Sequence, residues 1–291
     1  MRVAMTNPVI RYVYCLSPAG LHRMAYKEWG DPANPDVLVC AHGLTRVSDD
    51  FDVLASRLCD RYRVICPDIV GRGRSDHLRD PQYYAIPQYV ADVVTLIARL
   101  DVERVHWVGT SMGGLIGMVL AVQPANLIGK LVLNDIGPSL NAAAMTRIAE
   151  YIGQSPHFPS FDEALAYVKA ISASFGMHDE YQWRKLATDV LKESEGGWCF
   201  TYDAALAIPF KAMTMESVQA SQKLLWDVYD AIRCPTLLLR GVHSDLLSRE
   251  TAEEMTRRGP RAQLLELPDV GHAPTLLVPS QIDPVCEFLL S

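Results

Sequence analysis

Apolar runs and amphipathic stretches alternate along the first half of the chain and again near its end. Runs of this kind are typical of strands buried on both faces, and longer patterned stretches are typical of helices. Alternation of the two predicts an α/β fold with a mostly parallel central sheet flanked by helices and an antiparallel entry at its start. Strands are expected at 21–29, 37–41, 62–66, 104–108, 127–134, 235–240 and 263–267, and helices at 88–100 and 112–122.

The pattern changes after residue 137. Helix-like stretches such as 161–168 follow, separated by Pro156, Pro159, Gly176 and the pair Gly196-Gly197, and no buried strand run is visible. These residues predict a helical lid at 138–230, inserted between two parts of a core at 1–137 and 231–291. Aromatic and methionine side chains of the lid are candidates for an apolar pocket, although most are expected to pack within the lid: Phe158, Phe175, Trp183, Trp198, Tyr202, Phe210, Met213, Met215 and Trp226.

A Gly-x-Ser-x-Gly pentapeptide stands between a predicted strand and a predicted helix. It reads Gly109-Thr110-Ser111-Met112-Gly113. Glycines two residues to either side of Ser111 leave room for a sharp strand-to-helix turn that exposes the serine hydroxyl. We therefore expect Ser111 to be a nucleophile.

A nucleophilic serine needs a general base and an acid that orients it. Asp245 follows the predicted strand 235–240 and a glycine turn, and His272 follows the predicted strand 263–267 in Asp269-Val270-Gly271-His272. Ser111, Asp245 and His272 follow one another in the order nucleophile, acid, base. The glycine turn from Gly241 to Asp245 favours Asp245 as the acid, with His272 as the base. Asp135, at the end of the strand before the lid, is the alternative acid.

With these motifs the chain resembles the α/β-hydrolases, as a lidded, esterase-like member. Val37 to Leu44, with its His42-Gly43 step, resembles the strand and oxyanion loop of the family, and Asp68 to Ser75 resembles its Asp-x-x-Gly-x-Gly-x-Ser segment. The resemblance covers nearly the whole chain. It implies a lid above Ser111 and backbone N–H groups of Leu44 and Met112 as oxyanion donors.

Three neighbouring features have structural interpretations beside functional ones. His42 is expected to support its loop rather than touch substrate. Arg46 is a candidate for binding an acidic substrate group, but nearby Asp49, Asp50 and Asp52 favour a structural ion pair. The glycine-rich segment after Asp68 lacks the spacing of a phosphate-binding loop, so we expect Gly71 and Gly73 to adopt positive φ in a turn held by Asp68.

These residues predict a serine hydrolase, and within that class a carboxylesterase acting on a small-molecule ester. The serine disfavours relatives that use an aspartate nucleophile. Hydrolysis of a carbon–carbon bond in a vinylogous diketone is the alternative, followed by cofactor-free perhydrolysis. A non-catalytic ligand receptor of the same fold is the alternative from a different class.

Composition restricts the partners and the compartment. Of 291 residues, 49% are hydrophobic, and the net charge of -7 disfavours nucleic acid and anionic membranes as partners. The seven cysteines are dispersed without metal-ligand spacing, so neither a disulfide nor a metal is predicted, and no cofactor is expected. Without an apolar leader or a membrane-length apolar run, the protein is expected to be cytoplasmic.

Overall fold

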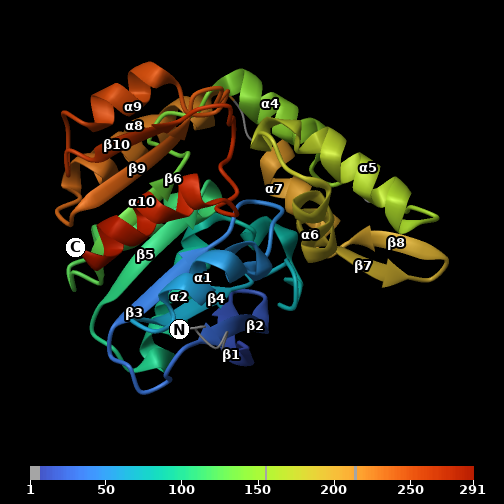
Figure 1. Ribbon diagram of the computed structural model, residues 1–291, viewed down its shortest axis with the longest axis horizontal. Coiled ribbons are helices and arrows are strands. Elements are labelled where there is room, and N and C mark those ends of the chain that lie inside the picture. Colours follow the sequence, from blue (N-terminus) through green and yellow to red (C-terminus); the bar gives the residue numbers. More distant parts are fainter. Residues whose placement is uncertain (1–6, 155, 213–214) are drawn as a thin grey trace.

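An eight-stranded sheet forms the centre of the molecule (Figure 1). The computed structural model describes residues 7–154, 156–212 and 215–291. Strand order across the sheet is β1-β2-β4-β3-β5-β6-β9-β10. The strands are β1 (Val9–Ser17), β2 (Gly20–Trp29), β3 (Val37–Ala41), β4 (Arg63–Pro67), β5 (Val105–Thr110), β6 (Ile128–Asn134), β9 (Thr236–Gly241) and β10 (Gln263–Leu267).

The parallel strands of this sheet are β3, β4, β5, β6, β9 and β10. By contrast, β1 and β2 form an antiparallel hairpin, and β2 also pairs antiparallel with β4. The expected α/β fold is therefore confirmed. Its antiparallel entry is formed by β1 and β2 and not by the first two predicted strands, 21–29 and 37–41, because β3 is one of the parallel strands. Predicted strands agree with the structure to within one or two residues, because most of them, such as β3 and β9, are apolar runs buried on both faces. Strand β1 lacks such a run, since most of its side chains are exposed.

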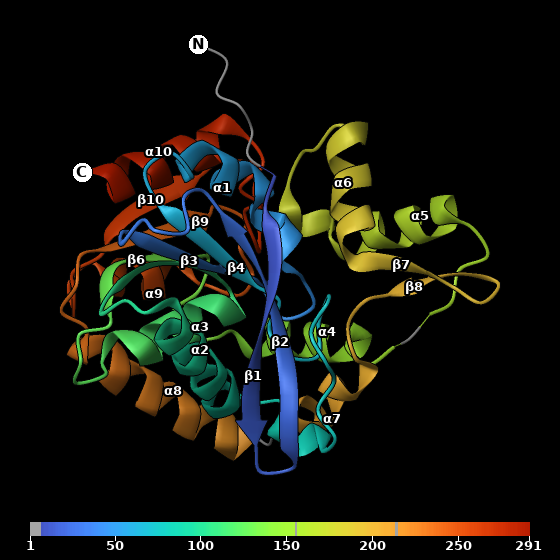
Figure 2. The same ribbon diagram turned by 90° about the horizontal axis from the view of Figure 1, so that it is seen from below.

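Helices cover both faces of the sheet (Figure 2). One face packs against α1 (Asp52–Leu58) and α10 (Pro279–Leu290), and the other against α2 (Ile86–Leu100), α3 (Met112–Ala121), α8 (Met215–Ala231) and α9 (Arg249–Met255). Successive side chains of a strand point to opposite faces of the sheet and therefore pack into different apolar cores. In β3, Val37 and Val39 belong to one core, and Leu38 and Cys40 belong to the other. Among the described residues, no helix is long and apolar enough to cross a membrane.

Between β6 and β9 the chain leaves the sheet and forms the segment from α4 to α7, which we call the cap. It contains α4 (Ala142–Tyr151), α5 (Phe161–Ile171), α6 (Glu180–Val190), α7 (Ala207–Lys211) and a hairpin of β7 (Leu191–Ser194) and β8 (Gly197–Phe200). The hairpin was not predicted, because its side chains are mostly exposed or half-buried and give no apolar run. The predicted lid at 138–230 also includes α8, which packs against α3 beside the sheet.

Aromatic residues of the cap pack mainly against one another, as expected. Phe158 contacts Tyr167 and Phe200, and Phe200 contacts Tyr202. Trp226 lies on α8 and stacks on Arg258. Met213 lies outside the described residues, and the side chain of Met215 is likewise not described. Phe175 is different, since its ring faces Arg46 beside the sheet.

The parallel strands bring their carboxyl ends to one edge of the sheet. The loops that follow them carry His42 to Leu44, Asp68 to Ser75, Ser111, Asp135, Gly241 to Asp245, and Asp269 to His272. Ligand sites of open α/β sheets form at this edge. The topology therefore gathers all motifs of the sequence at one place.

Helix α3 approaches β3 so closely that Gly113 has no room for a side chain. A Cβ there would lie 2.0 Å from the carbonyl oxygen of Ala41. We expect Gly113→Ala to destabilise the protein by about 2 kcal/mol or more, since relief requires a backbone shift. Urea unfolding of parent and variant measures the change. Gly43→Ala is the control, because its Cβ would meet only ordinary contacts from 3.7 Å outward; equal destabilisation in both variants would contradict the argument.

Candidate active site

Ser111 occupies the sharp turn between β5 and α3 that the pentapeptide predicts. Its backbone has φ 50° and ψ -113°, a conformation that costs free energy for a residue with a side chain. Both flanking glycines are required, since a Cβ at Gly109 would lie 2.3 Å from the carbonyl oxygen of Gly113. The indole N–H of buried Trp107 donates to that same carbonyl over 2.9 Å and supports the turn from below.

His272 lies between Ser111 and an aspartate. Its Nε2 is 3.0 Å from Ser111 Oγ, and its Nδ1 is 2.8 Å from Asp135 Oδ2. An imidazole that donates from Nδ1 to a carboxylate presents an unprotonated Nε2 to the serine hydroxyl. The arrangement is thus able to remove a proton from Ser111.

The carboxylate of Asp135 is fully buried and held by two further donors. Gly241 N–H donates to Oδ1 over 2.8 Å, and Ser244 Oγ–H donates to Oδ2 over 2.6 Å. Gly241 is the last residue of β9 and Ser244 lies in the loop that follows, so the strand next to β6 orients the acid. The sequence interpretation missed Ser244, which no motif distinguishes from other serines.

The prediction that Asp245 contacts the base was wrong. Its side chain is 46% exposed and forms an ion pair with Arg147 of α4, with Arg147 Nη2 2.8 Å from Asp245 Oδ2. The turn after β9 directs Ser244 inward and Asp245 outward, and the position beside His272 is filled from β6. Asp135 was the alternative, and its place directly after a buried strand next to β5 is the signal that favoured it.

Met112 directly follows the nucleophile, and Leu44 directly follows Gly43 of the oxyanion loop; their roles as oxyanion donors stay a prediction. Met112 is the first residue of α3, where backbone N–H groups have no acceptor within the helix. The oxyanion loop approaches Ser111 closely, since a Cβ built on Gly43 would be 3.8 Å from Ser111 Cβ. The carbonyl of Leu44 accepts a hydrogen bond of 2.8 Å from Arg72 Nε, which the sequence analysis did not anticipate.

His42 supports the oxyanion loop, in agreement with its structural interpretation. Its Nε2 accepts from Ile69 N–H over 2.9 Å, so the neutral ring donates from Nδ1 to the carbonyl of Gly43 over 2.7 Å. Burial lowers the pKa of His42 to about 4. The imidazole therefore stays neutral and links the loops after β3 and β4.

The segment after Asp68 is a turn, as predicted. Gly71 and Gly73 have φ values of 84° and 55°. The Asp68 carboxylate accepts from Ser48 N–H over 2.7 Å and from Arg74 N–H over 3.0 Å, so it holds the loop by its backbone.

Arg46 forms the expected ion pair and also reaches the cap. Its Nε and Nη2 donate to both oxygens of Asp50, and its Nη1 donates to the carbonyl of Leu186 in α6 over 3.2 Å. Nearby Asp189 is buried, which raises its pKa to about 6. All three donor groups of Arg46 are thus engaged within the protein, and its predicted role in substrate binding stays a prediction.

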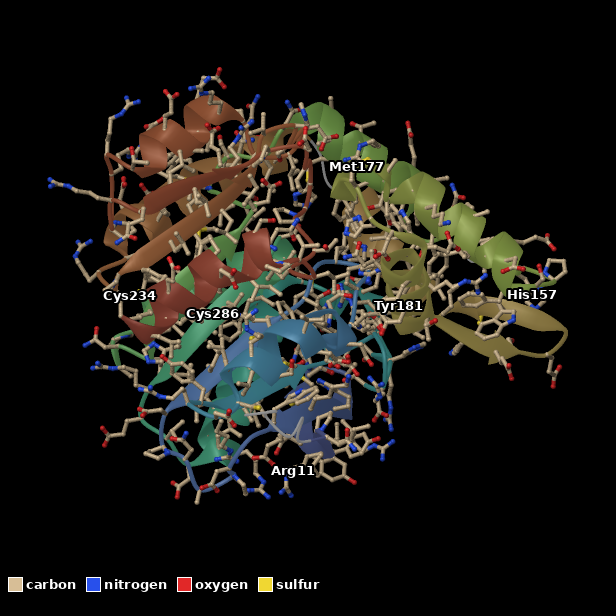
Figure 3. The ribbon with its side chains drawn as sticks, viewed as in Figure 1. Arg11, His157, Met177, Tyr181, Cys234 and Cys286 are labelled. Atoms are coloured by element: carbon tan, nitrogen blue, oxygen red, sulfur yellow. The ribbon has the colours of Figure 1, made fainter. Side chains whose placement is uncertain are left out.

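The cap is also hydrogen-bonded to the loop that carries His272, which we call the base loop. Gly271 N–H donates to the carbonyl of Ser174 over 2.7 Å, and Ser174 Oγ–H donates to the carbonyl of His272 over 2.5 Å. A further link joins His178 Nε2 to Thr275 Oγ1 over 2.9 Å. Two side chains with large apolar parts are strongly exposed on this part of the cap, that of Met177, which precedes His178, and that of Tyr181 in the first turn of α6 (Figure 3).

One group of possible metal ligands exists among the described residues. Cys15, His22 and Asp92 are buried together, far along the chain from the motifs. Asp92 already accepts from His22 Nε2 over 2.9 Å and from Gln88 Nε2 over 2.7 Å, and burial raises the pKa of the Cys15 thiol to about 12. These contacts join β1 and β2 to α2.

Figure 3 places Cys234 and Cys286 on the core, away from the cap.

Comparison with known proteins agrees with this geometry. Residues 38–285 match the model of the alpha/beta hydrolase family. The chain belongs to this family. It is 55% identical over 286 residues to a 3-hydroxybutyrate-oligomer hydrolase of Cupriavidus necator, covering 97% of this chain and 98% of that protein. The protein is therefore a hydrolase of the α/β fold.

Solved structures of this hydrolase family extend the likeness to the whole fold. An alpha/beta hydrolase from Novosphingobium aromaticivorans is 37% identical with a TM-score of 0.86, and the match covers 99% of both chains. A structure described as a hydrolase from Rickettsia typhi is 32% identical with a TM-score of 0.88, covering 97% of this chain and 99% of that one.

His42 predicts a pH-dependent contribution to stability. Its pKa is lowered on folding, so the contribution is fully present above the ordinary value near 6.5 and is lost as the pH falls toward 4. We expect His42→Gln to reduce the free energy of unfolding more at pH 7 than at pH 4.5. Urea unfolding at both values checks this, with His157→Gln as the exposed control. A difference that grows on acidification would contradict the assignment of a neutral imidazole.

Proposed function

We propose that this hydrolase is a serine esterase that cleaves the ester bonds of short 3-hydroxybutyrate oligomers. The observation that carries the proposal is the continuous contact from Ser111 Oγ through the His272 ring to the buried Asp135 carboxylate. The relative named for oligomer hydrolysis matches this chain over almost its full length and supports the choice of substrate.

The first half of the reaction forms an acyl-enzyme. As Ser111 Oγ attacks the ester carbonyl, its proton passes to His272 Nε2, and the carbonyl oxygen becomes an oxyanion. The N–H groups of Leu44 and Met112 stabilise this charge. The tetrahedral intermediate collapses when the imidazolium returns the proton to the departing 3-hydroxyl oxygen, which leaves as an alcohol.

The second half repeats these steps with water. His272 accepts a proton from a water molecule while the oxygen of that water attacks the acyl carbon. The second tetrahedral intermediate then expels Ser111 Oγ, which regains the proton from the His272 imidazolium. Net reaction adds one water to one ester bond and yields a carboxylic acid and an alcohol. Asp135 stabilises the imidazolium in both halves, and the donors on its carboxylate hold it in position.

The cap supplies the groups that select the substrate. It is attached to the base loop through Ser174 and to the oxyanion loop through Arg46. The exposed side chains of Met177 and Tyr181 lie within eight residues of Ser174 in the chain and offer apolar surface to the methyl-bearing chain of an oligoester. We propose that they contact the units beyond the cleaved bond.

The acid assignment has a matched pair of variants. Asp135→Asn should lower kcat by about 10⁴-fold, because an amide favours the wrong imidazole tautomer. Asp245→Asn removes only a half-exposed ion pair and should leave kcat within about twofold of the parent. Steady-state kinetics with p-nitrophenyl acetate measures both. The opposite ranking would return the acid role to Asp245.

The substrate assignment is tested with purified protein and the linear dimer and trimer of 3-hydroxybutyrate. We expect release of 3-hydroxybutyrate, detected by chromatography, and none from Ser111→Ala, which lacks the nucleophile. A fluorophosphonate probe should label the parent at Ser111 and leave that variant unlabelled.

The outcomes separate the levels of the proposal. Labelling of Ser111 with cleavage of p-nitrophenyl esters but not of the oligomers would contradict the substrate alone. Cleavage of a vinylogous diketone by a protein inert toward all esters would instead favour carbon–carbon hydrolysis.

A further inference from the structure

Arg72 is buried behind the two residues that flank the ester carbonyl in the proposed mechanism. Its side chain has no solvent exposure. Nε donates to the carbonyl of Leu44 over 2.8 Å, and Nη2 lies 3.4 Å from the sulfur of Met112. Its third contact, from Nη1 to the carbonyl of Val70 over 2.7 Å, fixes the guanidinium to its own loop.

The guanidinium charge is not neutralised by an ion pair. Among the residues that the structure describes, no carboxylate oxygen forms an ion pair with its nitrogens, and its polar contacts include two carbonyl oxygens, a thioether and the hydroxyl of Tyr89. The rings of Tyr89 and Tyr84 lie 4.9 Å and 5.9 Å from its central carbon. Burying a charge without an ion pair costs free energy of folding. A role in the site would explain why the arginine is kept at this position.

Two consequences follow for the oxyanion loop. The planar fork of arginine fixes Leu44 relative to Met112, because one rigid group touches both the oxyanion loop and the first residue of α3. Its positive charge also acts through a water-poor interior, where screening is weak. The same charge acts on His42, which supports the oxyanion loop. Burial is the main cause of the lowered pKa of His42, and the positive charge of Arg72 lowers it further.

We propose that Arg72 is a positioning residue for the oxyanion hole, holding the Leu44 and Met112 amides at the spacing that the tetrahedral intermediate requires and favouring its negative charge. The inference rests on the proposed function, because it takes these two amides as the donors. It assigns a task to the Gly71-Arg72-Gly73 turn, whose glycines serve only the backbone.

Three variants test the proposal. Arg72→Met keeps the volume and removes the charge and the donors, and Arg72→Lys restores the charge without the planar fork. Arg63→Met is the matched control. Arg63 is also a largely buried arginine that donates to a backbone carbonyl, that of Leu100, and unlike Arg72 it pairs with the carboxylate of Glu28. It lies at the start of β4, at the opposite edge of the sheet from Ser111.

The readouts are kcat and KM for p-nitrophenyl acetate and the affinity for an aryl trifluoromethyl ketone, which forms an oxyanion on a serine. Active sites are first counted with the fluorophosphonate, so that loss of folded protein does not count as loss of rate. We expect Arg72→Met to lower kcat and ketone affinity by about 10- to 100-fold with KM nearly unchanged, somewhat less than removal of one donor. Arg72→Lys should recover part of both losses, and Arg63→Met should show neither.

Each result bears on the proposal. Unchanged kcat and ketone affinity in Arg72→Met would overturn it, as would an equal loss in Arg63→Met. Should Arg72→Met fail to fold, Arg72→Lys decides: a fall of about threefold or more in both quantities supports the role, and parental values overturn it. Absence of fluorophosphonate labelling in the parent would instead defeat the serine mechanism and the inference with it.

Discussion

The close approach of α3 to β3 is the constraint on which the site depends. Gly113 lies against the carbonyl of Ala41 with no space for a side chain, and Gly109 is equally tight against Gly113. This contact forces Ser111 into its strained backbone conformation and points the start of α3 at the end of β3. Nucleophile and both flanking amides are consequently set by backbone packing, which is far stiffer than side-chain contacts.

The remaining groups of the site are fixed by the order of the strands. Asp135 directly follows β6. Its donors are Gly241, the last residue of β9, and Ser244 in the loop after β9, and His272 lies in the loop after β10. Since these three strands are neighbours in the sheet, the acid and the base meet without a long connection. The acid is thus provided by the strand nearest to the nucleophile and held in place by the next one.

The cap is joined to both walls of the site. Ser174 binds the base loop, while Arg46 joins the oxyanion loop to α6. A displacement of the cap would therefore move the groups on which the proposed chemistry depends as well as any substrate pocket. Arg72 has the complementary position below the site, where it connects the oxyanion loop to the helix that follows Ser111.

Sequence alone determined the class of the fold and most of the strands, because buried parallel strands are continuous apolar runs between turn residues. It also identified Ser111 and His272, since the tight turn requires glycines at fixed spacing and the histidine follows a strand. The hairpin of β7 and β8 was missed, because neither of its faces is buried well enough to leave a pattern.

Only the tertiary structure decided which aspartate reaches the base. Asp135 and Asp245 both follow buried strands, and the glycine turn from Gly241 to Asp245 favoured Asp245. In the structure that turn points Ser244 inward and leaves Asp245 to pair with Arg147. The direction of a side chain in a loop depends on contacts with segments distant in sequence. For the same reason, nothing in the sequence distinguished Arg72, whose carbonyl, sulfur and aromatic partners come together only when β3, β4, β5 and α2 pack.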